Sequence, residues 1–251
     1  MKTLALLALA LLALPVAVAA ATPLDTVLGL EDGRVALRFA ARDDVWGDGP
    51  SISVGDHDEP RGYWRRGPLH LLLTLRHGEL VDVDTRVAEP VPAGRAAGDV
   101  IDIGELAPDA AAALLLDLAV RLPGDEAEGL IFPATLARGV TVWPRLLEIA
   151  RDRRLNRDLR EQAIFWLGQD AAEAATRGLT AIVDDDDADL AVREQAVFAL
   201  SQRANDEGLP ALLQLVRASP HPQLRETALF WLAQHDDPRV LALFEEILLG
   251  N

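Results

Sequence analysis

The chain has 251 residues, half of them hydrophobic, and a formal net charge of −16 at pH 7. Such an acidic chain lacks the positive surface that binding to nucleic-acid phosphates or to anionic lipid requires. The sequence contains no cysteine, which excludes disulfides, thiol nucleophiles, cysteine-based zinc sites and a lipidated cysteine.

The N-terminus has the pattern of a secretory signal peptide. Lys2 provides the positive start, Leu4–Leu14 is an apolar run too short to cross a bilayer, and Ala17–Ala21 offers small residues for cleavage. The alternative is an uncleaved membrane anchor. No later run is apolar for long enough to span a membrane, so no stable anchor is expected. We therefore expect residues 1–21 to be removed and the mature chain to be periplasmic or secreted.

Residues 22–106 are predicted to be rich in β-strands. Apolar side chains alternate at Val35, Leu37 and Phe39, the period of a half-buried strand. Leu69–Leu75 and Leu80–Val87 flank the turn candidate His77-Gly78, which predicts a hairpin with Val81, Val83 and Val87 on one face. The region is near the lower size limit for an independent core, so we expect it to pack on the helices that follow. Further strands are expected at Ser51–Val54 and Val100–Ile103, and a linker or loop at 90–98.

From Pro108 onward the apolar residues recur at the spacing of helices. Helix pairs are expected to begin near residues 108, 142, 172 and 206, followed by a single helix from Pro238. Thr141 and the last acids of Asp184–Asp189 are expected to cap helices, and Asp237 is expected to cap the final one. The predicted class is therefore α+β, with an α-solenoid preceded by a small β-rich region.

A nine-residue phrase occurs three times, beginning at Glu161, Glu194 and Glu226. The spacings of 33 and 32 residues are typical of stacked helix pairs. An arginine precedes each copy, and we expect it to bond an acidic side chain or a carbonyl in a neighbouring repeat. The three copies read Glu-Gln-Ala-Ile-Phe-Trp-Leu-Gly-Gln, Glu-Gln-Ala-Val-Phe-Ala-Leu-Ser-Gln and Glu-Thr-Ala-Leu-Phe-Trp-Leu-Ala-Gln.

The segments Leu159–Leu167 and Val192–Leu200 resemble the second helix of HEAT-type repeats, closest to the HEAT-like repeats of the phycobilisome-lyase type. The β-rich region followed by Ile131–Ala137 also resembles secreted bacterial HEAT-repeat proteins. The resemblance implies an α-solenoid over residues 107–251, of about four helix pairs plus a terminal helix, used for protein binding. It does not imply lyase activity, because nothing in the chain matches a bilin site.

Each second helix has two distinct sides at 3.6 residues per turn. Alanine, tryptophan and leucine, as at Ala163, Trp166 and Leu167, are predicted to face the core. The phenylalanine and its flanking amides fall on another side, where they would form a row across the array. That row is either a partner-binding surface or a set of side chains packed between helices, and the sequence leaves both open. The candidate partner-binding residues are Gln162, Phe165, Gln169, Gln195, Phe198, Gln202, Phe230 and Gln234.

Two clusters of acids suggest metal binding only weakly. Asp184–Asp189 lacks the spaced ligands, the glycine and the terminal glutamate of a calcium loop, so an inter-helix turn is favoured. Asp56–Glu59 offers oxygen and imidazole ligands, but contiguous ligands in a loop rich in proline and glycine often arise by chance. The histidines are scattered, and no catalytic constellation or cofactor motif is found.

Three functions remain in competition. The first is a periplasmic or secreted scaffold that binds a protein or peptide partner on the solenoid. The second is an enzyme with its site in the β-rich region, around Trp46, Asp56–Glu59 and Trp64, and a deep polar pocket there would favour it. The third is a structural or regulatory subunit, such as a sensor. The identity of the partner and the oligomeric state are not encoded in any recognisable pattern.

Overall fold

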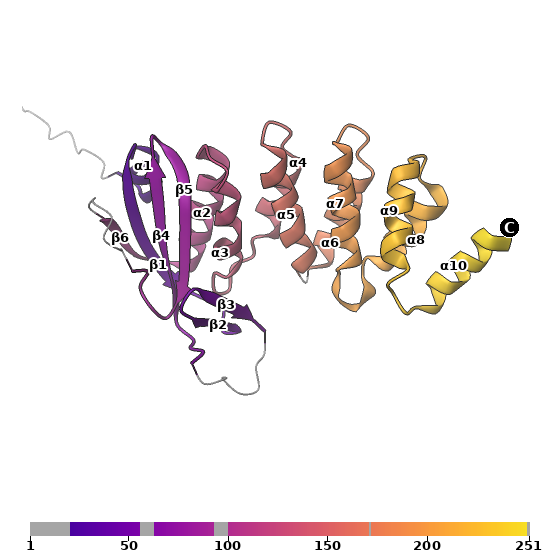
Figure 1. The fold of residues 1–251 in the computed structure, drawn as a ribbon, viewed down its shortest axis with the longest axis horizontal. Coiled ribbons are helices and arrows are strands. Elements are labelled where there is room, and N and C mark those ends of the chain that lie inside the picture. Colours follow the sequence, from indigo (N-terminus) through magenta and orange to yellow (C-terminus); the bar gives the residue numbers. More distant parts are fainter. Residues whose placement is uncertain (1–20, 56–62, 93–99, 171, 250–251) are drawn as a thin grey trace, which may run out of the picture.

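The computed structural model describes residues 21–55, 63–92, 100–170 and 172–249. Almost all of the expected signal segment lies outside these ranges, as do Asp56–Glu59 and most of the expected linker 90–98. A β region leads into a long row of stacked helices (Figure 1). The predicted α+β class with a C-terminal helical solenoid is therefore confirmed.

The β region consists of a four-stranded sheet in the order β5-β4-β1-β6 and a small hairpin, β2-β3. β6 runs parallel to β1, and the other neighbouring strands are antiparallel. In Figure 1 the hairpin projects from one end of the sheet. The elements are α1 (Pro23–Leu28), β1 (Gly33–Ala40), β2 (Val45–Asp48), β3 (Ser51–Val54), β4 (Pro68–Arg76), β5 (Glu79–Val87) and β6 (Val100–Leu106).

The predicted hairpin between β4 and β5 is confirmed. His77 and Gly78 have φ values of 53° and 77°, the positive values that a tight two-residue turn requires. The predicted face of β5 is wrong at one position. The register shifts within the hairpin so that Val81 has no partner on β4, and its side chain is 40% exposed. This is a β-bulge, which alternation in the sequence does not reveal.

The helical region follows the predicted pairs. A continuous core runs from Val27 in α1 to Leu243 in α10, so the sheet packs on the helices as expected. Within the described ranges, no helix is both long and apolar enough to cross a membrane. The elements are α2 (Pro108–Arg121), η1 (Ala127–Leu130), α3 (Ile131–Thr135), α4 (Trp143–Arg151), α5 (Arg157–Gln169), α6 (Glu173–Val183), α7 (Leu190–Ser201), η2 (Ala204–Asp206), α8 (Leu209–Ala218), α9 (Pro222–Leu232) and α10 (Pro238–Leu249).

Successive second helices approach closely because small residues lie at their contact. A Cβ added to Gly168 of α5 would lie 3.0 Å from the Cβ of Ala199 in α7. Glycine at this position therefore lets the two backbones come together. A Cβ at Gly208 would overlap the carbonyl oxygen of Leu200, so the start of α8 also depends on glycine.

The arginines that precede the repeated phrase bond acids or carbonyls as predicted, but only Arg160 does so in a neighbouring repeat. Arg160 and Arg193 are buried, and Arg160 forms an ion pair with Asp189 of the next helix pair at 2.6 Å. Asp189 therefore stands at the start of α7 without the expected side-chain cap bond. Thr141 does not cap α4 either, because that helix begins one residue later, after Val142. Each arginine also donates to a carbonyl at the end of the first helix of its own pair, at Ala150, Val183 and Ser219.

A further buried arginine, Arg203, joins three consecutive helix pairs. Its guanidinium donates to Thr176 Oγ1 at 2.9 Å, to the carbonyls of Asp170 and Ala172, and to Glu207 at 2.5 Å. The side chain is 1% exposed. These bonds link the end of α5, the start of α6 and the segment before α8, so Arg203 fixes how the pairs stack.

Candidate functional site

Six aromatic side chains follow one another along the α3–α9 part of the helical row. Phe132 stacks on Trp166 with ring centroids 5.0 Å apart, and Phe165 meets the same tryptophan edge-on at 5.1 Å. A second trio repeats the arrangement at 4.7 and 5.0 Å in α7 and α9. We call the six side chains the aromatic track: Phe132, Phe165, Trp166, Phe198, Phe230 and Trp231.

The phenylalanines of the track belong neither to the buried core nor to a fully exposed row. Phe165 and Phe198 are half-buried, and Phe230 is 61% exposed. Leu167 and Leu200, two residues further along the same helices, are buried. Each ring thus rests on the helical array and still offers an edge to solvent.

The glutamines lie beside the track, and no hydrogen bond joins any two of them in the described chain. Gln162 and Gln195 are half-buried, while Gln169, Gln202 and Gln234 are exposed. Of these five glutamines, only Gln202 has a side-chain hydrogen bond within the described chain, to Ser201 Oγ at 3.1 Å. The remaining amides have free donors and acceptors, which is the chemistry needed to bind a peptide backbone.

The sequence placed the tryptophans of the phrase on the core side, and they do pack against the core, but neither is fully buried. Trp166 and Trp231 are half-buried at the edge of the second-helix face. Each one contacts a phenylalanine of the preceding pair, so each extends the track from one pair to the next. In α7 the same position holds Ala199, which is buried, so the two trios are not joined by a third tryptophan.

Two clefts adjoin the N-terminal end of the track. One, of about 590 Å³, lies between Val54 of β3, the segment 135–142 and the end of α5, with Trp166, Gln169 and Asp170 in its wall. Within the described chain, the indole Nε1 of Trp166 is buried without a hydrogen-bond partner. The other cleft, of about 480 Å³, is bounded by β3, β5 and Phe132. The track therefore begins in a recess between the β2-β3 hairpin and the helices.

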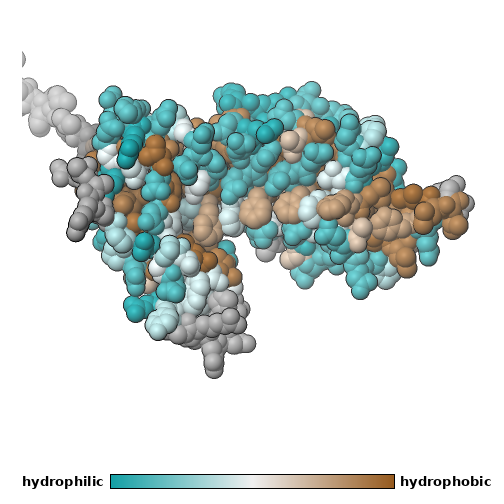
Figure 2. All heavy atoms as spheres, in the orientation of Figure 1, coloured by the Kyte–Doolittle hydropathy of each residue, from teal (hydrophilic) through white to brown (hydrophobic). Residues whose placement is uncertain are grey.

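The opposite end of the track meets an exposed apolar surface. Leu241 and Leu248 of α10 are 62% and 83% exposed. The terminal helix therefore does not close the array with a polar face, as a capping helix would. Figure 2 shows hydrophobic surface along the middle of the helical row, widening over α9 and α10.

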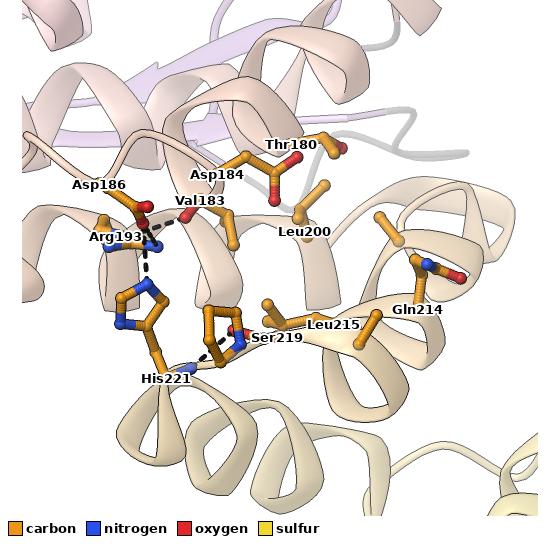
Figure 3. Close-up of a pocket in the computed structure, with 13 residues that line it drawn as sticks. Thr180, Val183, Asp184, Asp186, Arg193, Leu200, Gln214, Leu215, Ser219 and His221 are labelled. Atoms are coloured by element: carbon orange, nitrogen blue, oxygen red, sulfur yellow. Dashed lines mark hydrogen bonds and ion pairs between the residues drawn. The ribbon is translucent and has the colours of Figure 1, made fainter.

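A separate pocket of about 290 Å³ lies between α6 and α8 (Figure 3). Three of its titratable groups are paired with one another: Asp186 lies 3.1 Å from Arg193 and 2.8 Å from His221 Nε2. The hydrogen bond from His221 lowers the pKa of the Asp186 carboxyl below its ordinary value. Arg193 and Leu200 lie about 140–160° round α7 from Phe198, so this pocket is turned away from the track. We interpret the three paired residues Asp186, Arg193 and His221 as a link between helix pairs.

Of the candidate enzyme site in the β region, the described residues hold only Trp46 and Trp64. Trp46 is 8% exposed and lies under Arg66, whose guanidinium carbon is 4.0 Å from the ring centroid. Trp64 is half-buried, and Asp56–Glu59 lies outside the described residues. In the ranges that the structure covers, no three His, Asp or Glu side chains gather as a metal site would require. Four of the five acids in Asp184–Asp189 are partners of Arg153, Arg160, Arg193 and His221.

Comparison with known proteins agrees with the geometry of the helical row. Residues 144–229 match the family model described as HEAT repeats. The helix pairs within residues 144–229 are therefore similar to HEAT repeats. No curated protein matches the chain. A solved structure described as "Lipid-protein interactions in lipovitellin" is similar to the chain, with 16% identity, a TM-score of 0.41, and coverage of 77% of this chain and 26% of that one. The chain thus spans about a quarter of that protein's length.

Proposed function

We propose that this protein is an exported scaffold that binds a protein or peptide partner on the aromatic track. HEAT repeats commonly mediate protein–protein interaction, which supports this class of function. The observation that carries the proposal is the row of partly exposed aromatic rings on α5, α7 and α9, beside glutamine amides of which only that of Gln202 is hydrogen-bonded within the described chain. Contiguous exposed apolar surface on a soluble protein is typical of an interaction site, and large aromatic side chains supply most of the affinity of such sites.

Export is proposed from the N-terminal sequence alone. Lys2, the apolar run Leu4–Leu14 and the small residues that follow have the composition of a cleaved signal. The mature chain is then expected to begin between Ala20 and Pro23. N-terminal sequencing of protein recovered outside the cytoplasm measures this start directly, and recovery of a chain that still begins at Met1 would contradict cleavage.

The binding role is tested by removing the rings. We expect the combined change Phe165→Ala, Phe198→Ala and Phe230→Ala to weaken binding by at least 30-fold, because anchor residues at an interface contribute about 2 kcal/mol or more each when truncated. The probes are 12-residue peptides selected on the wild-type protein from a random display library, and the measurement is their dissociation constant.

A matched control changes three apolar side chains of similar exposure in the β region: Leu28→Ala, Val81→Ala and Ile101→Ala. This control should bind the selected peptides within twofold of wild type. Peptides that bind the track variant as tightly as the wild-type protein would contradict the proposal.

A further inference from the structure

A row of carboxylates accompanies the aromatic track. Glu161, Glu194 and Glu226 occupy one equivalent position on α5, α7 and α9, four residues before the phenylalanine of each helix. Residues four apart on a helix lie on the same side, so each glutamate is a neighbour of its ring. Glu226 is exposed, and the other two are half-buried.

Among the basic residues of these three helices, only one pairs with a glutamate of this row. Arg160 and Arg193 are turned into the interior, where their side chains are only 4% and 6% exposed. Arg225 donates to the carbonyl of Ser219 at 2.6 Å. Arg157, at the start of α5, pairs with Glu161 at 3.3 Å. In the described ranges, Glu194 and Glu226 have no basic partner within ion-pair distance, so the surface beside the track is acidic.

Acids also stand at both ends of the track. Asp82 and Asp84 line the cleft that holds Phe132, and Asp84 lies 3.6 Å from Arg86. At the other end, Glu245 is exposed on α10. The whole chain carries a net charge of −16. An acidic, aromatic surface is complementary to a segment that is both cationic and apolar.

The distance between neighbouring glutamates along the array indicates the backbone conformation of that segment. Packed helices lie about 8–10 Å apart, so neighbouring glutamates are separated by about that distance along the array. An extended polyproline II segment has three residues per turn and rises about 3.1 Å per residue, so its side chains at i and i+3 point the same way about 9 Å apart. Its backbone has no internal hydrogen bonds, and the free amides of Gln162 and Gln195 can bind it.

We propose that the track binds an extended cationic segment, with lysine or arginine at every third residue over Glu161, Glu194 and Glu226 and apolar side chains over the phenylalanines. This inference rests on the proposed function, and it specifies the chemistry of the partner. Aromatic-lined grooves are a common way to recognise extended segments, because such segments lose little conformational entropy on binding.

The test uses synthetic peptides with a three-residue repeat. The probe is (Pro-Leu-Lys)₄, and the comparison peptides are (Pro-Leu-Glu)₄ and (Pro-Ser-Lys)₄. We expect the first to bind the full mature chain at least tenfold more tightly than either of the others. Raising the salt concentration from about 50 to 300 mM should weaken its binding several-fold, since exposed ion pairs are screened.

Matched charge variants locate the contact. Glu161→Gln, Glu194→Gln and Glu226→Gln together should weaken binding of (Pro-Leu-Lys)₄ by at least tenfold and flatten its salt dependence. The control removes three acids from first helices, as Asp109→Asn, Glu148→Gln and Glu173→Gln, and should stay within twofold of wild type. Both variants change the net charge equally. A difference in peptide affinity between them is therefore due to the three glutamates beside the track.

Three results would overturn the inference: equal losses in the two charge variants, equal binding of the lysine and glutamate peptides, or no binding of the lysine peptide. If the lysine and glutamate peptides bind equally and Phe198→Ala abolishes both, the cationic preference is refuted and the scaffold proposal stands. The scaffold proposal fails separately, when the loss of the three rings leaves the selected peptides bound.

Discussion

Replacing Arg203 by alanine is expected to lower the free energy of unfolding by about 3–5 kcal/mol, as removal of one partner from a buried charged network does. The guanidinium is almost inaccessible and donates to side chains and carbonyls from three helix pairs. Alanine leaves the carbonyls of Asp170 and Ala172 without this donor and leaves Glu207 without its ion pair. Each buried acceptor that loses its partner costs about 1–3 kcal/mol.

Urea denaturation of Arg203→Ala and of a matched arginine variant measures this effect. Arg177 also pairs with a glutamate four residues away, at 2.6 Å, but its side chain is 66% exposed. Arg177→Ala should therefore change the free energy of unfolding by about 0.5 kcal/mol or less. A loss below 1 kcal/mol for Arg203→Ala would show that the helix pairs stack without this arginine.

The helical row could be predicted from the sequence because its signal is repeated and local. The phrase beginning at Glu161 returns at Glu194 and Glu226, and its helical period marks the buried face three times over. The β region offers no such repetition. The short helix Pro23–Leu28 is marked mainly by the capping box of Thr22 and Asp25, and the bulge at Val81 changes the register without a glycine or proline to mark it.

The candidate site was predicted in part. The phenylalanines of the phrase were placed on a face of their own, and they lie there. Phe132 was missed because its helix carries no copy of the phrase, and Trp166 was assigned to the core because its angle on the helix lies at the boundary between core and surface. Arg203 was missed for a related reason: the residue after the closing glutamine is Asp170, Arg203 and His235 in the three pairs, so no pattern repeats.

Replacing Leu200 by alanine is expected to lower the free energy of unfolding by about 3 kcal/mol, within the range for a buried leucine. Leu200 is 2% exposed and packs in the continuous core. Phe198, two residues earlier on the same helix, is half-buried and contacts Trp231 with ring centroids 4.7 Å apart. Phe198→Ala should therefore cost only about 1–2 kcal/mol, which includes the aromatic pair itself at about 0.5–1.5 kcal/mol.

The central claim is that the phenylalanine row is a surface of the helical array and not part of its core. Urea denaturation of Leu200→Ala and Phe198→Ala compares the two sides of α7 within one helix pair, so both variants report on the same neighbours. The claim predicts that Leu200→Ala loses roughly twice as much stability as Phe198→Ala, or more. Equal losses of about 3–5 kcal/mol, the cost of truncating a core phenylalanine, would place Phe198 in the core and leave the proposed scaffold without its binding surface.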